Sequence, residues 1–219
     1  MKRALFLTIV LSLVFVCAGS NRGNEPVRGG SVVVAISSDP GGLNPAITTQ
    51  GGVHLICGSI FSGLVAHDFD LKPVPDLAER WEVSPDGRTY TFYLAHDAEF
   101  QDGTPVTSAD VQFTFEQLLL KYHSRTRASI GDNLRRIETP DPHTVVFEFD
   151  HPYAAFLQLV DVTNAPVMPK HLYEGTDPLT NPHNKAALNR KPRRFMKILL
   201  IYKQHSRLHI FVNLFIGKV

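Results

Sequence analysis

The chain has 219 residues, of which 43% are hydrophobic and 20% charged, an ordinary composition for a globular protein with one sizeable core or two small ones. The formal net charge of +1 gives no reason to expect a polyanionic partner, so we expect no nucleic-acid binding. Only Cys17 and Cys57 are present, which excludes a framework of several disulfides.

Residues 1–18 are typical of a secretory signal peptide. Lys2 and Arg3 give a basic start, and the apolar run over residues 4–16 is too short to span a bilayer comfortably. Val16 and Ala18 suit cleavage after Ala18. Lipidation of Cys17 is an alternative that bulky Val16 disfavours, and a buried N-terminal element is another. The signal predicts a protein in the periplasm or at the extracellular face of the cytoplasmic membrane.

A loop follows the first predicted strand. Residues 19–30 are polar and rich in Gly, as in a tether, and residues 31–36 (SVVVAI) are typical of a buried strand. Residues 37–44 then collect turn formers at the strand end, a common place for ligand contacts. Backbone groups there could pair with an extended peptide, with hydroxyls adding bonds. The candidate ligand-binding residues are Ser37, Ser38, Asp39 and Pro40, and the alternative is an ordinary turn.

The next segments alternate between predicted helix and strand. Apolar spacing predicts a helix over residues 53–64, in which Cys57 is a small buried hydrophobe rather than a reactive thiol. Residues 64–66 begin a strand, and residues 76–80 form a short helical turn. The sequence Ser-Pro-Asp-Gly at residues 84–87 predicts a turn between extended residues 81–83 and a return strand at 89–94.

A capped helix begins near Thr107. The Thr107 side chain can cap free amides, and Asp110 favours the positive helix end. An apolar face then predicts about four turns of amphipathic helix. Alternation predicts a strand at residues 144–149, and short helices follow at 153–160 and after Pro169. The chain is therefore predicted to be α+β.

No constellation of residues indicates catalysis or metal binding. The eight histidines before residue 185 are scattered without ligand spacing, and we expect them at the surface. Carboxylates lie mostly beside Gly or Pro, where Asp caps backbone amides. Aromatic residues at strand or helix spacing belong to the core; these are Trp81, Tyr90, Phe92, Phe113 and Phe115. Without a nucleophile elbow, a phosphate loop or a zinc-protease motif, we expect neither an enzyme nor a cofactor.

Several segments in order resemble one family. They are SSDPGGLNP, IFSGLVAHD, LKPVPDLAERWEVSPDGRTYTFYL, DAEFQDGTPVTSADVQFTFE, ETPDPHTVVFEF and NAPVMPKHLYEGTDP. This combination resembles the extracellular solute-binding proteins of the peptide and nickel class, which serve ABC importers. The resemblance extends from about Gly30 to about Asn184.

The resemblance implies an incomplete periplasmic-binding-protein-like fold with two lobes. Residues 31–52 would give the first segment of lobe one, residues 53–164 an extra α+β domain, and residues 165–184 the return to lobe one. The second lobe would need a few hundred further residues. The implied partners are a peptide or other small-molecule solute and an ABC permease in the membrane, and we expect a monomer.

Residues 185–219 depart from this family pattern. From Lys185 onward the chain has nine basic and no acidic residues, leaving 13 of its 22 basic and all 21 acidic residues before that point. We interpret the tail as out-of-frame or unselected sequence; a genuine basic interaction tail or a membrane-surface segment is the alternative.

Three functional hypotheses follow from these patterns. The first is a non-enzymatic binding module that captures a peptide-like solute by cleft closure. The second is a truncated or frameshifted fragment without ligand-binding activity. The third, a secreted hydrolase, is disfavoured because no catalytic constellation is present.

Overall fold

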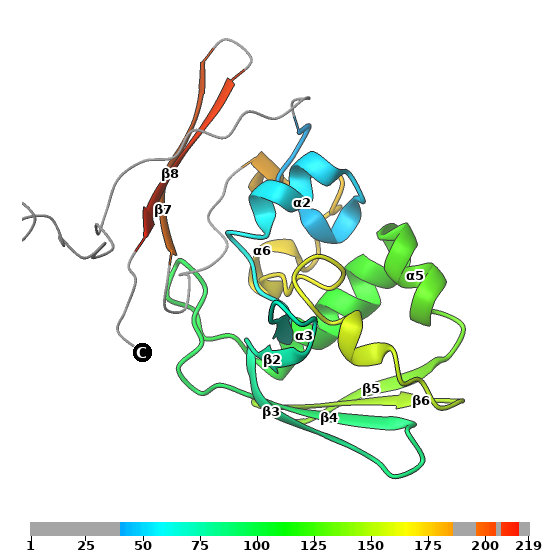
Figure 1. The fold of residues 1–219 in the computed structure, drawn as a ribbon. Helices are drawn as coiled ribbons and strands as arrows, with labels where there is room; N and C mark the ends of the chain where they lie inside the picture. The colour runs from blue at the N-terminus through cyan, green and yellow to red at the C-terminus, as the bar shows by residue number, and fades with distance from the viewer. Residues whose placement is uncertain (1–39, 186–195, 205–206, 215–219) are drawn as a thin grey trace, which may run out of the picture.

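The computed structural model describes residues 40–185, 196–204 and 207–214, with side chains for the first of these ranges. Figure 1 shows a sheet forming one layer and the helices gathered on one side of it. The helices between residues 40 and 133 are η1 (Pro45–Ile47), α2 (Gly51–Cys57), α3 (Ser108–Phe113), η2 (Thr114–Leu119), α4 (Leu120–Tyr122) and α5 (Ser124–Ile130). The helices between residues 150 and 185 are η3 (Phe156–Gln158), α6 (Lys170–Tyr173) and η4 (Pro182–Lys185).

The main sheet is antiparallel, with strand order β3-β4-β6-β5. Its members are β3 (Ala78–Val83), β4 (Thr89–Leu94), β5 (Leu134–Asp141) and β6 (Thr144–Phe149). The predicted turn at residues 84–87 joins β3 to β4, and Gly87 takes φ +67°, which a side chain would disfavour. The predicted strands at 89–94 and 144–149 are confirmed.

An aromatic cluster fills the covered face of the sheet. Alternate residues of β4 and β6 are buried, among them Tyr90, Phe92, Phe147 and Phe149. Phe156 of η3 is fully buried, and its ring centroid lies 4.7–6.1 Å from those four rings. The prediction that Tyr90, Phe92 and Phe115 belong to the core is confirmed, and Trp81 and Phe113 pack against it half-buried.

The capped helix is present, and it anchors a distant segment. The Thr107 backbone amide and hydroxyl both donate to one Asp110 carboxylate oxygen at 2.8 Å, closing a capping box. The other Asp110 oxygen accepts from the Lys170 backbone amide at 2.9 Å. Thr114 begins the π-helical turn η2, and its hydroxyl oxygen accepts from the Met168 amide at 2.9 Å. The start of this helix therefore fixes residues 168–170.

Three predicted elements differ from the structure. Helix α2 ends at Cys57 instead of continuing to residue 64, because the chain turns at Gly58 and Gly63 lies against the backbone of residues 160–162. Residues 78–80 belong to strand β3 rather than to a helical turn, since they pair with β4. Residues 153–160 form only the short helix η3.

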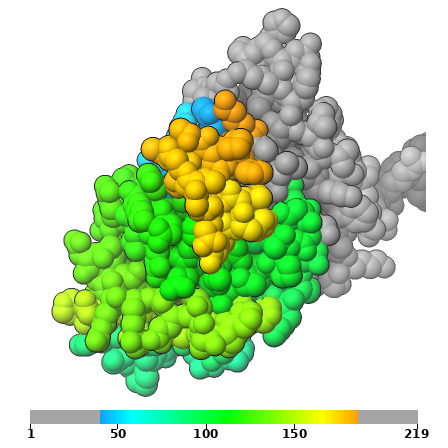
Figure 2. Space-filling view, turned by 180° about the vertical axis from the view of Figure 1, so that it is seen from behind, coloured from blue at the N-terminus to red at the C-terminus, as the bar shows by residue number. Residues whose placement is uncertain are grey.

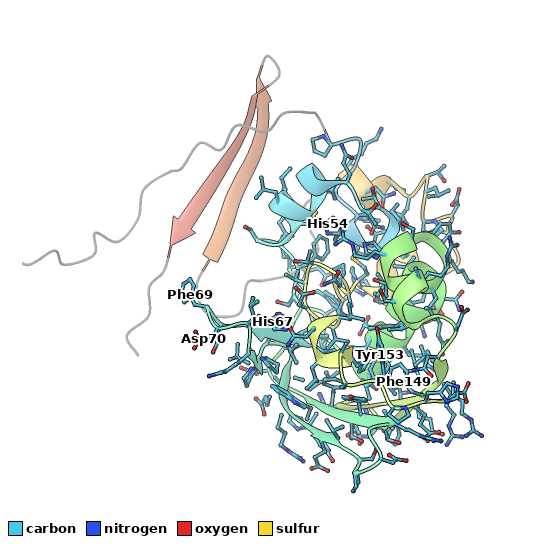
Figure 3. All side chains as sticks on the ribbon, turned by 45° about the vertical axis from the view of Figure 1, so that its right-hand side comes forward. His54, His67, Phe69, Asp70, Phe149 and Tyr153 are labelled. Carbon is cyan, nitrogen blue, oxygen red and sulfur yellow. The ribbon has the colours of Figure 1, made fainter. Side chains whose placement is uncertain are left out.

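The remaining strands make two small sheets. Strand β1 (Val65–His67) pairs antiparallel with β2 (Pro73–Pro75), and β7 (Met196–Gln204) pairs antiparallel with β8 (Arg207–Leu214). The hairpin between β1 and β2 ends in a turn where Leu71 takes φ +61°. Figure 3 shows Phe69 and Asp70 projecting from this turn, and Phe69 is fully exposed.

Candidate ligand-binding site

A pocket of about 670 Å³ lies between residues 41–53 and residues 179–185. Its volume falls within the ~300–1,000 Å³ typical of small-ligand sites. One wall comes from η1, α2 and the residues before them, and the other from residues 179–185. Figure 2 shows these two parts of the chain side by side at one end of the molecule. The pocket therefore forms where segments far apart in sequence meet.

Two buried asparagines join the two walls. The Asn44 side-chain amide donates to the Asn184 side-chain oxygen at 3.1 Å, and Asn184 donates in turn to the Pro178 carbonyl at 2.7 Å. The Leu43 amide also donates to the Asn184 backbone carbonyl at 2.5 Å. Asn44 additionally caps η1 by accepting from the Ala46 amide. This network sets the spacing of the pocket walls.

The rim on the first wall is held by a histidine. The Thr48 hydroxyl oxygen accepts from the Gln50 amide at 3.2 Å, and the Thr48 carbonyl lies 2.8 Å from Nε2 of His54 on α2. Because a carbonyl can only accept, His54 Nε2 carries the hydrogen of this bond. His54 thus ties the first turn of α2 to the rim.

The second wall is organised by its own side chains. Asn181 is buried, donates to the Leu172 carbonyl and the Thr176 hydroxyl at 2.8 Å each, and accepts from the His183 amide. Thr180 donates to the Asp177 carboxylate on the exposed side. These bonds keep residues 176–184 in one conformation without any regular strand.

The predicted contact loop lies largely outside the described residues. Ser37, Ser38 and Asp39 are not described, while Pro40 is half-buried and directly precedes Gly41, which lines the pocket. Their role in ligand contact stays a prediction. Cys17 and the signal peptide also lie outside the described residues. No sequence pattern singles out Asn181 and Asn184, because their role depends on tertiary contacts.

The other candidate groups occupy structural positions. Cys57 is fully buried, and burial raises the pKa of its thiol to about 12, which confirms its prediction as an unreactive hydrophobe. Asp68 and Asp102 accept from backbone amides in turns, as predicted. Within residues 40–185, no group of three or more His, Cys, Asp or Glu side chains could hold a metal ion.

The expectation that the histidines are scattered at the surface is wrong for His123. This side chain is fully buried, and its ring centroid lies 5.5 Å from that of His54. Burial, His54 and Arg125 lower the pKa of His123 to about 4. Figure 3 shows His54 on α2, on the side toward α5.

Several side chains of the pocket lining can form hydrogen bonds. Its polar lining consists mainly of amides and hydroxyls, with the Lys185 ammonium as the charged side chain among its lining residues. Such groups can orient a ligand through hydrogen bonds. In the described parts of the chain, no helix is long and apolar enough to cross a membrane.

Similar solved structures define the class of protein. NikZ from Campylobacter jejuni, solved in complex with Ni(L-His), is 25% identical with a TM-score of 0.68, over 88% of this chain and 38% of that chain. The ABC transporter-associated periplasmic binding protein DppA from Helicobacter pylori, solved with the peptide STSA, is also 25% identical, with a TM-score of 0.63 over 80% of this chain and 38% of that chain. The α+β fold is therefore part of the periplasmic-binding-protein-like fold, as predicted.

The family follows from the sequence. Residues 72–192 match the bacterial extracellular solute-binding proteins, family 5 Middle. Protein XP55 from Streptomyces lividans is 34% identical over 163 residues, covering 74% of this chain and 29% of that protein. The chain belongs to the family 5 extracellular solute-binding proteins, which confirms the resemblance to the peptide and nickel class. It spans only 29–38% of the length of these three relatives.

Proposed function

We propose that this chain supplies one side of a binding site for a peptide or similar small solute, as the solute-binding component of an ABC import system. The observation that carries the proposal is the pocket between residues 41–53 and 179–185, in a family that includes a protein solved with a bound peptide. The proposed role is non-enzymatic and lies outside the cytoplasmic membrane, after cleavage following Ala18 or lipidation of Cys17.

The chemistry of the pocket supports a peptide-like solute. The side-chain amide of Gln50 and the hydroxyls of Thr48 and Thr180 can pair with backbone amides and carbonyls of an extended ligand. The loop that holds Ser37, Ser38 and Asp39 leads directly into this wall and would add further polar groups. A second lobe, which the family resemblance implies, would close on the ligand.

A second candidate is a fragment of this family with no binding activity. It is favoured by the length of the relatives and by the change from acidic to basic composition at Lys185. A one-lobed site leaves much of a ligand in water, which weakens binding. The nucleotide sequence past the Asn184 codon, read in all frames, tests this idea directly, because resumed family sequence would identify the tail as out-of-frame.

Isothermal titration of residues 19–219 with the peptide STSA and with a mixed tetrapeptide library tests the binding proposal. We expect saturable binding that Gln50→Ala weakens ~10-fold, the effect of losing one good hydrogen bond. Gln117→Ala, on the exposed side of η2, is the matched control and leaves affinity unchanged. Absence of binding in every titration would refute the proposal and favour the inactive fragment. Mass spectrometry of the recovered peptide tests the hydrolase alternative.

A further inference from the structure

Two histidines, half-buried His54 and fully buried His123, meet between α2 and the start of α5. The rings of His54 and His123 lie edge to face, with an interplanar angle of 72° and centroids 5.5 Å apart. His54 Nδ1 and His123 Nε2 are both buried, and neither has a hydrogen-bond partner among the described residues. Each ring therefore has one satisfied and one unsatisfied nitrogen, and the unsatisfied pair belongs to neighbouring rings.

Only the neutral forms of these rings fit their surroundings. His54 already donates from Nε2 to the Thr48 carbonyl, so its protonation would add a hydrogen at Nδ1, where no acceptor is present. The Thr126 hydroxyl donates its hydrogen to the Asn164 carbonyl at 2.6 Å, so His123 Nδ1, at the start of α5, donates to that hydroxyl at 2.7 Å. Protonated His123 would carry its second hydrogen on Nε2, which is buried and has no acceptor among the described residues.

The neighbouring charges do not compensate a positive charge on the pair. On α5, Arg125 adds a further positive charge near His123. On α4, the Lys121 ammonium is turned to solvent, where it donates to Gln117. In the loop that packs against α5, Asp161 accepts from the Asn164 backbone and side chain and lies 3.9 Å from His67. Thr48, the residue after η1, contributes its carbonyl, which binds His54 only as an acceptor.

The histidine pair is connected to the pocket through two residues of its lining. Thr48 lines the pocket and is the acceptor for His54, while Gln50, also in the lining, accepts the His54 backbone amide at 3.2 Å. A separation of α2 from α5 would therefore move the rim that Thr48 and Gln50 form. The capped end of α5 would loosen at the same time, because His123 is its cap.

We propose that His54 and His123 form an acid-sensitive latch, which holds the pocket rim in its ligand-ready position while both rings are neutral and releases it when they are protonated. As regulation of the pocket, this inference rests on the proposed function. It predicts a binding protein that retains its solute near neutral pH and gives it up in acid.

Hydrogen exchange of residues 19–219 without ligand tests the latch by itself. We compare the chain with the double variant His54→Gln and His123→Asn at pH 7.5 and at pH 4.5, so that intrinsic exchange cancels at each pH. Gln can still donate to the Thr48 carbonyl, and Asn is a good helix cap that does not titrate. We expect equal protection at pH 7.5 and, at pH 4.5, ~10-fold lower protection of residues 46–57 and 124–130 in the parent chain.

The control is His171→Gln, which removes an exposed histidine paired with Asp102 and should leave the acid response of residues 46–57 intact. Equal protection of parent and double variant at pH 4.5 would overturn the latch. If the double variant does not fold, His54→Gln alone keeps the test, because it removes one of the two charges. Titration with the peptide STSA at both pH values tests the proposed function separately. If the parent chain loses protection against exchange in acid but does not bind the peptide at pH 7.5, the latch stands and the proposed function is contradicted.

Discussion

The asparagine pair that joins the pocket walls allows a quantitative prediction. Asn184→Ala removes the acceptor of the Asn44 amide and the donor to the Pro178 carbonyl. Asn44 is only 2% exposed, so its amide would be left without a partner in the interior. An unsatisfied buried group costs ~1–3 kcal/mol and a lost second bond ~1 kcal/mol. We expect Asn184→Ala to lower the free energy of unfolding by about 2–4 kcal/mol.

The assay is urea unfolding combined with a double-mutant cycle. Asn44→Ala, Asn184→Ala and the double variant isolate the direct bond, for which we expect a coupling of about 1 kcal/mol. Hydrogen exchange of the Leu43 amide, which donates to the Asn184 carbonyl, reports the local opening of the walls. Thr180→Ala, on the exposed rim, is the control and should change stability by less than ~0.5 kcal/mol.

If the losses in the free energy of unfolding of the two single variants add up to the loss of the double variant, the two side chains do not interact and the reasoning is refuted. A loss below about 0.5 kcal/mol for Asn184→Ala would also refute it, because water would then be satisfying Asn44. Either result would remove the asparagine bridge as the determinant of wall spacing.

Three further predictions concern the rest of the molecule. Phe156→Ala empties the centre of the aromatic cluster and should cost about 3–5 kcal/mol in urea unfolding, whereas Phe156→Leu should cost clearly less; equal losses would contradict the packing argument. In Leu71→Gly the left-handed conformation no longer costs ~1–2 kcal/mol of strain, whereas the greater entropy of the unfolded chain offsets up to ~1 kcal/mol of this gain. We therefore expect a higher melting temperature, and Leu71→Ala as a control should give no such gain. Because the pKa of His123 falls from its usual 6.5 to about 4, His123 is protonated at higher pH in the unfolded chain than in the folded one. Its contribution to the free energy of unfolding is therefore full above pH 6.5 and is lost as pH falls toward 4, a decrease of about 3 kcal/mol. An unchanged pH dependence of unfolding in His123→Asn would contradict this.

Local patterns in the sequence predict the elements that depend on neighbours along the chain. The alternation in residues 89–94 and 144–149 and the Thr107 cap each appear in the structure where they are predicted. Strand β5 and helix α5 were not predicted. In β5 only Ile137 is buried, so the strand lacks alternation, and α5 is capped by a histidine, which is an uncommon cap residue.

Fewer residues of the candidate site than of the fold could be predicted from the sequence. Asn44 lies in the loop that the sequence analysis selected, but its partner Asn184 is 140 positions away. The burial of His123 likewise depends on α2, from a distant segment, and has no periodic signal. Tertiary contacts of this kind decide which of several turn-forming segments become pocket walls.

The bonds from Asp110 and Thr114 to residues 168–170 restrict how a closing motion could be distributed along the chain. Residues 168–170 lead from the part of the chain near the sheet to the second pocket wall, and the amides of Met168 and Lys170 are held by Thr114 and Asp110. Bending at residues 168–170 would break one buried and one partly buried hydrogen bond, so these residues are unsuited to act as a hinge. The main sheet and the pocket wall at residues 179–185 should therefore move as one rigid body, and we expect the hinge of any closing motion outside residues 168–170.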